Sequence, residues 1–313
     1  MSDIKLFRLG DAVHELTPST AIIERSLQRL FEGNLEKLLG IRFLASEFST
    51  GPVHGGRIDT LGIDEDGTPV IIEYKRAMNE NVINQGLFYL DWLMDHRKDF
   101  QWLVLDKLGQ DIAAKVDWSS PRLLCIAGDF TRYDSHAVKQ INRSIELIRY
   151  RRFDSDYLMI ELVHAPRQAP RSAPAPATET DGGGEESVAR ADPYQSQRID
   201  YRLQNASAPL RDVWDAASTF LSSLGDDVQI KPVSLYYAFK RIRNFVCMEL
   251  YPQKGVVLAF VKLDPTSVTI EPGFTRDVRK IGHFGTGDLE ISMRTTDDVT
   301  KALPLFQRAY DQG

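Results

Sequence analysis

Apolar residues recur along the first part of the chain at helical spacing. From about residue 20 to residue 39 they occur every three or four positions, at Ile23, Leu27, Leu30, Phe31, Leu35 and Leu38. The segment Thr17-Pro18-Ser19-Thr20 is typical of a helix start, and Gly40 is typical of a helix end. The pattern predicts one long helix that ends near Leu39 and has one apolar face.

Shorter apolar runs follow, and most have the length of strands. Strands are expected at 41–48, 57–63 and 69–75, and Asp64-Glu65-Asp66-Gly67 joins the last two as a tight turn. Further elements are predicted in this order: a helix at 80–95, strands at 101–105 and 122–127, a helix at 134–148, and a strand at 157–163. This mixture predicts an α/β domain over residues 1–164.

The character of the chain changes between residues 165 and 198. This stretch is rich in proline, alanine and glycine and has almost no large apolar residue, so it is predicted to be a flexible linker. A second, smaller α/β domain is expected at 199–313. Its helices are predicted at 209–224 and 296–310, and its strands at 228–230, 236–240, 245–250, 256–262 and 289–293. We expect the two halves to fold separately.

The composition excludes several classes of protein. The net charge of −6 argues against coating nucleic acid through bulk positive charge, although a local basic groove remains compatible with it. Cys125 and Cys247 lie far apart in apolar stretches, which argues against a disulfide framework or a cysteine zinc site. No apolar run is long enough to span a membrane, and the first residues lack the pattern of a signal peptide. We therefore expect a cytoplasmic protein.

Three charged residues of the predicted hairpin carry the candidate chemistry. Asp59 lies in one strand, and Glu73 and Lys75 lie two residues apart in the other. Because side chains alternate along a strand, Glu73 and Lys75 share a face, and pairing across the turn can bring Asp59 onto it. Carboxylate oxygens suit a hard cation such as Mg²⁺, which binds phosphate oxygens and activates water.

An ordinary surface hairpin with a Glu–Lys pair is the alternative interpretation. The apolar run at 70–72 favours a buried central strand instead, where charges are costly unless they are paired or metal-bound. On the following helix, Gln85 and Tyr89 share a face and are candidates to contact phosphate or water. Taken separately, Gln85 could equally be a surface residue and Tyr89 a residue at the edge of the core.

Together these residues resemble the PD-(D/E)xK nuclease superfamily, and within it the NucS-type endonucleases. The resemblance covers about residues 24–93 and rests on a helical glutamate, here Glu24, and on three motifs: Gly56-Arg57-Ile58-Asp59, Glu73-Tyr74-Lys75 and Gln85…Tyr89. Ile58 stands where the name-giving proline would be. The resemblance implies a restriction-endonuclease-like mixed sheet flanked by helices.

The resemblance also implies roles for the matching residues. Asp59, Glu73 and Glu24 would bind Mg²⁺ or Mn²⁺, while Lys75 and Gln85 would join Asp59 and Glu73 as catalytic residues. Apart from the resemblance, we expect Arg57 and Tyr89 to contact nucleic acid. The assignment of Glu24 is less specific, because Glu32 and Glu36 lie on the same predicted helix.

The second half resembles a small domain of unknown function that occurs beside nuclease-like domains. Lys240, Arg241 and Arg243 interleave with aromatic residues there, which suits contact with nucleic acid or, equally, a solvated strand edge. The glycines at 282, 285 and 287 could cradle a phosphate, but a turn before a strand is the simpler interpretation.

The sequence therefore predicts a metal-dependent endonuclease that hydrolyses phosphodiester bonds in DNA. A homodimer is considered as well. Two rival interpretations stay open: a non-catalytic module that binds nucleic acid on a nuclease fold, and a protein-interaction factor dominated by the second domain.

Overall fold

The computed structural model of the protein describes residues 4–19, 24–75, 81–154, 156–166 and 195–313. The chain divides into two units, Met1–Pro166 and Arg167–Gly313, which are described separately. Most of the linker predicted at 165–198 lies outside the described residues. Within the described ranges, no helix combines the length and apolar character that crossing a membrane requires.

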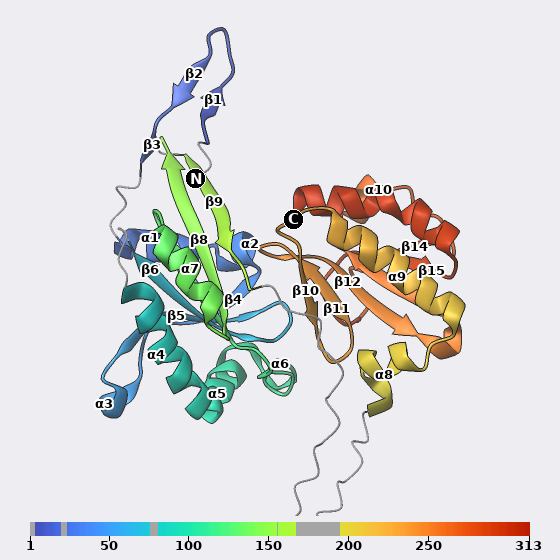
Figure 1. Ribbon diagram of the computed structural model, residues 1–313, viewed down its shortest axis with the longest axis horizontal. Helices are drawn as coiled ribbons and strands as arrows, with labels where there is room; N and C mark the ends of the chain where they lie inside the picture. Colours follow the sequence, from blue (N-terminus) through green and yellow to red (C-terminus); the bar gives the residue numbers. More distant parts are fainter. Residues whose placement is uncertain (1–3, 20–23, 76–80, 155, 167–194) are drawn as a thin grey trace, which may run out of the picture. The chain divides into compact units, whose positions relative to one another are not determined.

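A seven-stranded mixed sheet forms the centre of the first unit (Figure 1). The strand order is β3-β8-β7-β6-β5-β4, and β9 also pairs with β8. Strands β6, β7 and β8 run parallel to one another, and the other pairs are antiparallel. The bounds are β3 (Pro18–Ser19), β4 (Ile41–Ser49), β5 (Arg57–Asp64), β6 (Pro69–Lys75), β7 (Arg122–Ala127), β8 (Ser144–Phe153) and β9 (Tyr157–His164).

Helices cover both faces of this sheet. On β6, Ile71 joins the apolar core that also contains residues of α4, α5 and α7, whereas Tyr74 contacts Phe31 of α1 with a ring separation of 5.8 Å. The predicted fold class, a mixed sheet flanked by helices, is confirmed. The helices are α1 (Glu24–Glu32), α2 (Leu35–Leu39), α3 (Gly51–His54), α4 (Asn81–Asp95), α5 (Arg97–Leu108), α6 (Gln110–Ala113) and α7 (Arg132–Gln140).

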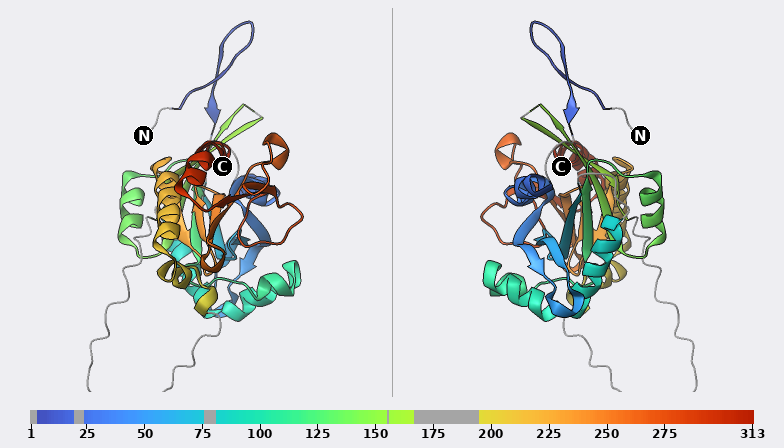
Figure 2. Two further views of the ribbon diagram at one scale, coloured as in Figure 1. Left: turned by 90° about the vertical axis from the view of Figure 1, so that its right-hand side faces the viewer. Right: turned by 90° about the vertical axis from the view of Figure 1, so that its left-hand side faces the viewer.

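A hairpin of two short strands, β1 (Leu6–Arg8) and β2 (His14–Leu16), precedes the sheet and was not predicted. It extends away from the body of the first unit in both views of Figure 2. Its apolar side chains are largely exposed, with Leu9 reaching 80%. An isolated hairpin of this size gains little stability from burial.

The prediction of a single helix that ends near Leu39 is wrong in one respect. The structure has two helices there, and Gly33 and Asn34 lie between them. Both residue types have low helix propensity, so they are a natural place for the break. The predicted end is confirmed, because Gly40 adopts a left-handed backbone with φ of 66°. Residues 20–23 of the predicted helix lie outside the described residues.

Two other predictions of secondary structure are wrong. Residues 101–105 belong to helix α5, in which Phe100 and Val104 are buried one turn apart while Trp102 is 71% exposed. A short apolar run does not by itself distinguish a buried strand from one face of a helix. The helix predicted at 134–148 ends at Gln140, and β8 begins at Ser144, because the apolar residues of 145–150 are used in sheet pairing.

The packing of α4 on β7 depends on a glycine. A Cβ atom on Gly86 would lie 2.4 Å from Cδ1 of the buried Leu123. We therefore expect Gly86→Ala to lower the free energy of unfolding by about 1–3 kcal/mol, as overpacking of a core does. Urea denaturation measures this. Gly10→Ala, where nothing lies closer than 3.9 Å, is the control and should change stability little. Equal stabilities would show that α4 shifts freely.

An antiparallel six-stranded sheet forms the second unit, in the order β10-β11-β12-β13-β15-β14. Helices α8 (Ile199–Gln204), α9 (Ala208–Ser223) and α10 (Thr296–Gln312) contribute to one core with it, in agreement with the predicted α/β character. The short strand β14 and helix α8 were not predicted. The strands are β10 (Gln229–Pro232), β11 (Tyr237–Lys240), β12 (Asn244–Tyr251), β13 (Val256–Val261), β14 (Thr275–Asp277) and β15 (Leu289–Met293).

Candidate functional site

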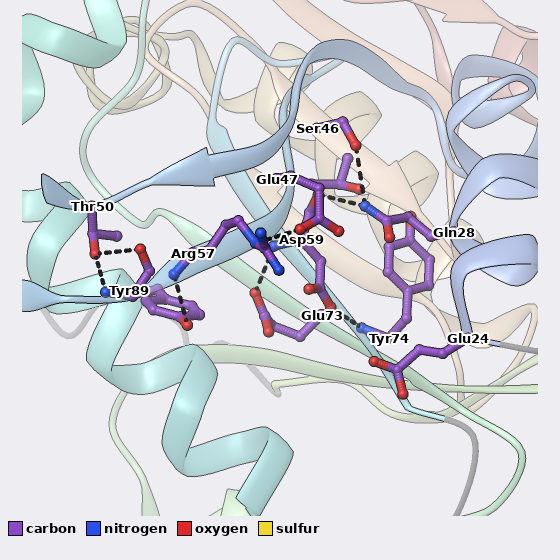
Figure 3. Close-up of polar contacts among 12 residues, drawn as sticks. Glu24, Gln28, Ser46, Glu47, Thr50, Arg57, Asp59, Glu73, Tyr74 and Tyr89 are labelled. Carbon is purple, nitrogen blue, oxygen red and sulfur yellow. Dashed lines mark hydrogen bonds and ion pairs between the residues drawn. The ribbon is translucent and has the colours of Figure 1, made fainter.

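Strands β5 and β6 separate at the position of the two candidate carboxylates. Their regular pairing extends as far as Thr60 opposite Ile72. Beyond that pair, side chains replace the backbone ladder: the N–H of Asp59 donates to Glu73 Oε1 at 3.2 Å, and the N–H of Tyr74 donates to Asp59 Oδ2 at 3.0 Å (Figure 3). The structure thus brings Asp59 and Glu73 together, as strand parity predicted.

Both carboxyl groups are held in an environment that opposes their charge. The pKa of Glu73 is raised to about 9, mainly by burial and also by the nearby Asp59 carboxylate, while the Asp59 N–H and Lys75 lower it. Burial also raises the pKa of Asp59 to about 6, against the Tyr74 N–H and Lys75. Glu73 is fully buried, and its Oε2 has no hydrogen-bond partner among the described residues. A strongly perturbed carboxyl pair beside a cleft is typical of functional sites.

Lys75 and Glu24 reach the same place from different elements. Lys75 ends β6, and its Nζ lies 3.6 Å from Glu24 Oε1 at the start of α1. Glu24 also raises the pKa of both Asp59 and Glu73, so its charge faces the pair. Glu32 instead accepts a hydrogen bond from Thr60, which distinguishes it from Glu24.

Gln28 is a part of this site that the sequence analysis missed. Its buried side-chain amide donates to the backbone oxygen of Asp59 at 2.8 Å, and also to Ser46 and Glu32 (Figure 3). Gln28 therefore fixes the backbone that carries Asp59. Its spacing of four residues from Glu24 was the available signal, because residues so spaced share a helix face.

Asp59 faces an open cleft of about 750 Å³. Arg57, Gln85 and Tyr89 line it as well, so the structure gathers four of the predicted site residues at one surface. Arg57 is exposed and pairs with Glu47 at 2.5 Å. The remaining lining residues belong to the segment around α3: Ser49, Gly51, Pro52, Gly55 and Gly56.

Tyr89 holds the backbone just before Asp59. Its hydroxyl accepts hydrogen bonds from the Arg57 N–H and from the Gln85 amide, each at 3.1 Å. Its ring lies against Gly56, where a Cβ atom would come within 2.5 Å of the ring. The ring is 5% exposed, so Tyr89 is both a residue of the core edge and a lining residue of the cleft.

Removal of the Tyr89 hydroxyl should loosen this segment. We expect Tyr89→Phe to lower the free energy of unfolding by about 1–3 kcal/mol, because the Arg57 N–H then loses its acceptor in a partly buried place. Urea denaturation monitored by circular dichroism measures the effect. Tyr133→Phe, at a position 64% exposed, is the matched control and should cost less than about 0.5 kcal/mol. Equal losses in both variants would contradict the role given to Tyr89.

The donor set fits a hard divalent cation that keeps much of its water. Two carboxylates supply oxygen ligands, and one of their oxygens, Glu73 Oε2, is buried with no partner in the described part of the chain. Within the described ranges no three histidine, cysteine, aspartate or glutamate side chains converge as a metal cage. Mg²⁺ is commonly held by one or two carboxylates together with water and substrate phosphates, so a pair of carboxylates is sufficient for it.

Three basic residues of the second unit, Lys240, Arg241 and Arg243, were predicted to contact nucleic acid. In the structure each of them interacts with other residues of the chain. Lys240 is 4% exposed and lies within the sheet rather than on its surface. Arg241 pairs with Asp227 at 2.6 Å and stacks on the ring of Tyr310. Arg243 is half-buried in the turn before β12 and also has interactions of its own. The role of these three residues in binding nucleic acid stays a prediction.

The glycine-rich segment 282–287 forms a turn before β15. Gly285 and Gly287 have positive φ, and a Cβ on Gly287 would lie 2.5 Å from the backbone of Phe260. The close approach to the sheet explains the glycine there without a phosphate.

Comparison with known proteins identifies relatives of both units. The model of a domain of unknown function, DUF5655, matches residues 199–313. An uncharacterized protein from Haemophilus influenzae is 29% identical over 291 residues, covering 92% of each chain. The sequence similarity therefore extends over both halves of the chain.

Solved structures are similar over part of the chain. A repair endonuclease from Pyrococcus abyssi is 19% identical, with a TM-score of 0.28 over 41% of this chain and 47% of its own. A complex of EndoMS with double-stranded DNA is 21% identical, with a TM-score of 0.26 over 45% of this chain and 49% of its own. EndoMS in apo form has a TM-score of 0.25 over 64% of its length. The chain thus spans about half to two thirds of these proteins, and its activity has to be inferred from its own residues.

Proposed function

We propose that the first unit is a metal-dependent endonuclease that hydrolyses phosphodiester bonds in DNA. The observation that carries the proposal is the pair Asp59 and Glu73, which come together where β5 and β6 separate. Glu73 Oε2 is buried there and has no hydrogen-bond partner among the residues that the structure describes. The resemblance of the surrounding motifs to the PD-(D/E)xK superfamily supports the same chemistry.

In this proposal Asp59 and Glu73 would hold Mg²⁺ or Mn²⁺, with Glu24 near the same charge cluster. A bound divalent ion supplies Lewis-acid polarisation of a phosphate oxygen and lowers the pKa of water. Its positive charge would also favour the ionised form of both carboxyl groups, above all of Glu73, whose raised pKa opposes ionisation at neutral pH.

The neighbouring side chains would position the substrate. Lys75, 19% exposed and held near Glu24, would stabilise the charge that develops on the phosphate. Arg57 is the exposed cation of the cleft and would contact the nucleic-acid backbone once released from Glu47. Gln85 and Tyr89 would fix the segment from Gly56 to Asp59, and the substrate phosphate would lie against this segment.

The test is a cleavage assay with the full chain on single-stranded, duplex, branched and mismatched DNA. Cleavage is expected with Mg²⁺ or Mn²⁺ and none with a chelator. Binding of Mn²⁺ by the protein alone, followed by electron paramagnetic resonance, should be lost in Asp59→Asn. Absence of both cleavage and Mn²⁺ binding would reject the proposal. Retention of DNA binding alone would then favour the non-catalytic module.

A further inference from the structure

The candidate site lies at the edge of the first sheet where the three parallel strands end. In the register of these strands, Lys75 of β6 lies beside Ala127 of β7, and Ala127 lies beside Arg149 of β8. Residues that lie side by side in neighbouring strands share a face of the sheet, so Lys75 and Arg149 share one. Ligands of open α/β sheets bind outside the carboxyl ends of the strands. The same edge therefore extends from the candidate site to β8.

Two arginines lie at this edge beyond β6. Arg151 follows Arg149 by two positions on β8 and so lies on the same face of the sheet. Arg132 is the first residue of α7, which begins after a short loop, residues 128–131, that follows the end of β7 (Figure 1). Arg132 is exposed, and Arg151 is half-buried. The two arginines thus reach the same edge from different elements.

The acidic groups around these arginines have partners of their own. Asp129, in the loop before α7, contacts Arg149 at 2.8 Å, and Arg149 also donates to Glu161 at 3.0 Å. Asp134, in the first turn of α7, is 6% exposed and accepts the N–H of Thr131 at 2.7 Å. Within the described ranges the two arginines form no ion pair, so their positive charges remain available to a ligand.

We propose that Arg132 and Arg151 together bind one further phosphate of the nucleic-acid strand that is cleaved at Asp59 and Glu73. This inference rests on the proposed function. Strands β6 and β8 are two strand spacings apart, which is about 10 Å. Three nucleotides span this length along a duplex, at roughly 3.4 Å each, so the bound phosphate lies about three nucleotides from the cleaved bond. Guanidinium groups suit this contact because they donate paired N–H groups to phosphate oxygens.

A strand of nucleic acid that crosses this edge meets positive charge on both sides of the two carboxylates. The strand order places β5 on one side of β6, and β7 and β8 on the other. Arg57, at the start of β5, is exposed and lines the cleft that Asp59 faces. The cations therefore form a separated line across the strand ends. An extended polyanion can contact the whole line, whereas a small anion can contact only one part of it.

Binding of duplex DNA by the full chain tests this inference. Fluorescence anisotropy in chelator, where no metal-dependent cleavage occurs, measures the dissociation constant at several salt concentrations. The double variant Arg132→Gln, Arg151→Gln should raise the dissociation constant by about tenfold or more. It should also reduce the slope of log affinity against log salt by about one, the value for one lost phosphate contact.

Arg143→Gln is the matched control. Arg143 is exposed just before the amino end of β8, so it lies at the opposite edge of the same sheet. Its variant should bind with the affinity and the salt slope of the wild type. Wild-type affinity and slope in the double glutamine variant, an equal loss in Arg143→Gln, or a wild type that binds no DNA would each overturn the inference.

A lysine variant separates loss of the contact from loss of folding. Arg132→Lys with Arg151→Lys retains both charges, and lysine binds phosphate as a point charge, so this variant should retain the salt slope of the wild type. The glutamine variant should keep the circular dichroism spectrum of the wild type. If the lysine variant lost the slope as the glutamine variant does, charge at these two positions would not be what binds the strand, and the inference would fail.

Two further measurements identify the ligand and separate this inference from the proposed function. Inorganic phosphate at millimolar concentration should not displace the DNA; displacement that depends on the two arginines would indicate a site for a small anion and overturn the strand contact. Cleavage is measured in parallel with Mn²⁺. If the wild type bound DNA through these arginines but did not cleave it, the proposed nuclease function would fail, whereas the phosphate contact would be supported.

Discussion

Glu73→Gln is expected to abolish metal-dependent cleavage, with a loss of about a thousandfold or more. The amide keeps the shape of the side chain but cannot contribute a negative oxygen to a divalent ion. Loss of several kcal/mol of stabilisation in the transition state corresponds to this factor. The measurement is the initial rate on a fluorescently labelled DNA substrate with saturating Mg²⁺. Asp106→Asn, an exposed acidic residue of α5, is the matched control and should retain full activity.

The same variant should be more stable than the wild type when metal is absent. Because the pKa of Glu73 is raised to about 9 in the folded protein, from 4.5 in the unfolded chain, the folded state retains a proton that the unfolded state releases. Stability should therefore fall as the pH rises from about 4.5 to about 9, by at most about 1.4 kcal/mol per pH unit.

In Glu73→Gln this proton is no longer needed, so the dependence should flatten across that window. Urea denaturation in chelator at pH 5, 7 and 9 measures the two slopes. A residual slope from Asp59 should remain near pH 4 to 6, where its own pKa is raised. If stability depended on pH in the same way for the wild type and the variant, Glu73 would not be a buried, protonated acid in the metal-free protein. If the variant cleaved DNA at the wild-type rate, Glu73 would be excluded as an essential metal ligand.

Arg122→Met is expected to destabilise the first unit by about 3–5 kcal/mol. Arg122 is buried on β7 and forms two hydrogen bonds to Glu146 at 2.7 and 2.8 Å and one to Asp64 at 2.9 Å. Burial alone would lower the pKa of Arg122, but the two carboxylates hold it above its usual range. Without the guanidinium, both acids remain buried and lose the positive charge that lies between them.

The substitution should also destabilise the turn between β5 and β6. The other oxygen of Asp64 accepts the N–H groups of Asp66 and Thr68, so the Arg122 pair anchors the turn that fixes the register of the hairpin. Thermal and urea denaturation measure the change. Arg276→Met, whose side chain is 56% exposed beside Glu290, is the control and should cost less than about 1 kcal/mol. If the two variants lost similar amounts of stability, burial of the Arg122 cluster would contribute nothing to the stability of the first unit.

Arg122→Lys separates charge from geometry. Lysine retains one positive charge but cannot form the paired hydrogen bonds to Glu146. The free energy of unfolding of Arg122→Lys should therefore lie between those of the wild type and Arg122→Met. Complete rescue by lysine would mean that the charge alone matters.

The sequence could predict the candidate site because its main residues are close along the chain. A short turn at 64–67 forces Asp59 and Glu73 to opposite positions of one hairpin, and strand alternation then assigns them a shared face. Gln85 and Tyr89 follow on the next helix with a spacing of four. Gln28 was missed because its spacing of four residues from Glu24 indicates only a shared helix face, whereas its hydrogen bond to the backbone oxygen of Asp59, 31 residues away, depends on tertiary packing.

The errors in secondary structure have a related cause. The run from Gln101 to Leu105 is apolar enough for a strand, and its helical state depends on Phe100 and Val104 entering the core together. The segment after Gln140 became strand β8 because β7 and β9 are available to pair with it. In both places tertiary contacts decided between two states that local propensity left close in energy.

By itself, the sequence determined the α/β character of both halves, the β5–β6 hairpin and the residues that this hairpin brings together. These features follow from local periodicity, since the interacting groups are separated by few freely rotating bonds. The tertiary structure alone decided the parallel order β6-β7-β8 and the buried cluster of Asp64, Arg122 and Glu146. Each of these depends on which distant segments pack together, and that choice is made by the burial of the whole core, which no short stretch of the chain encodes.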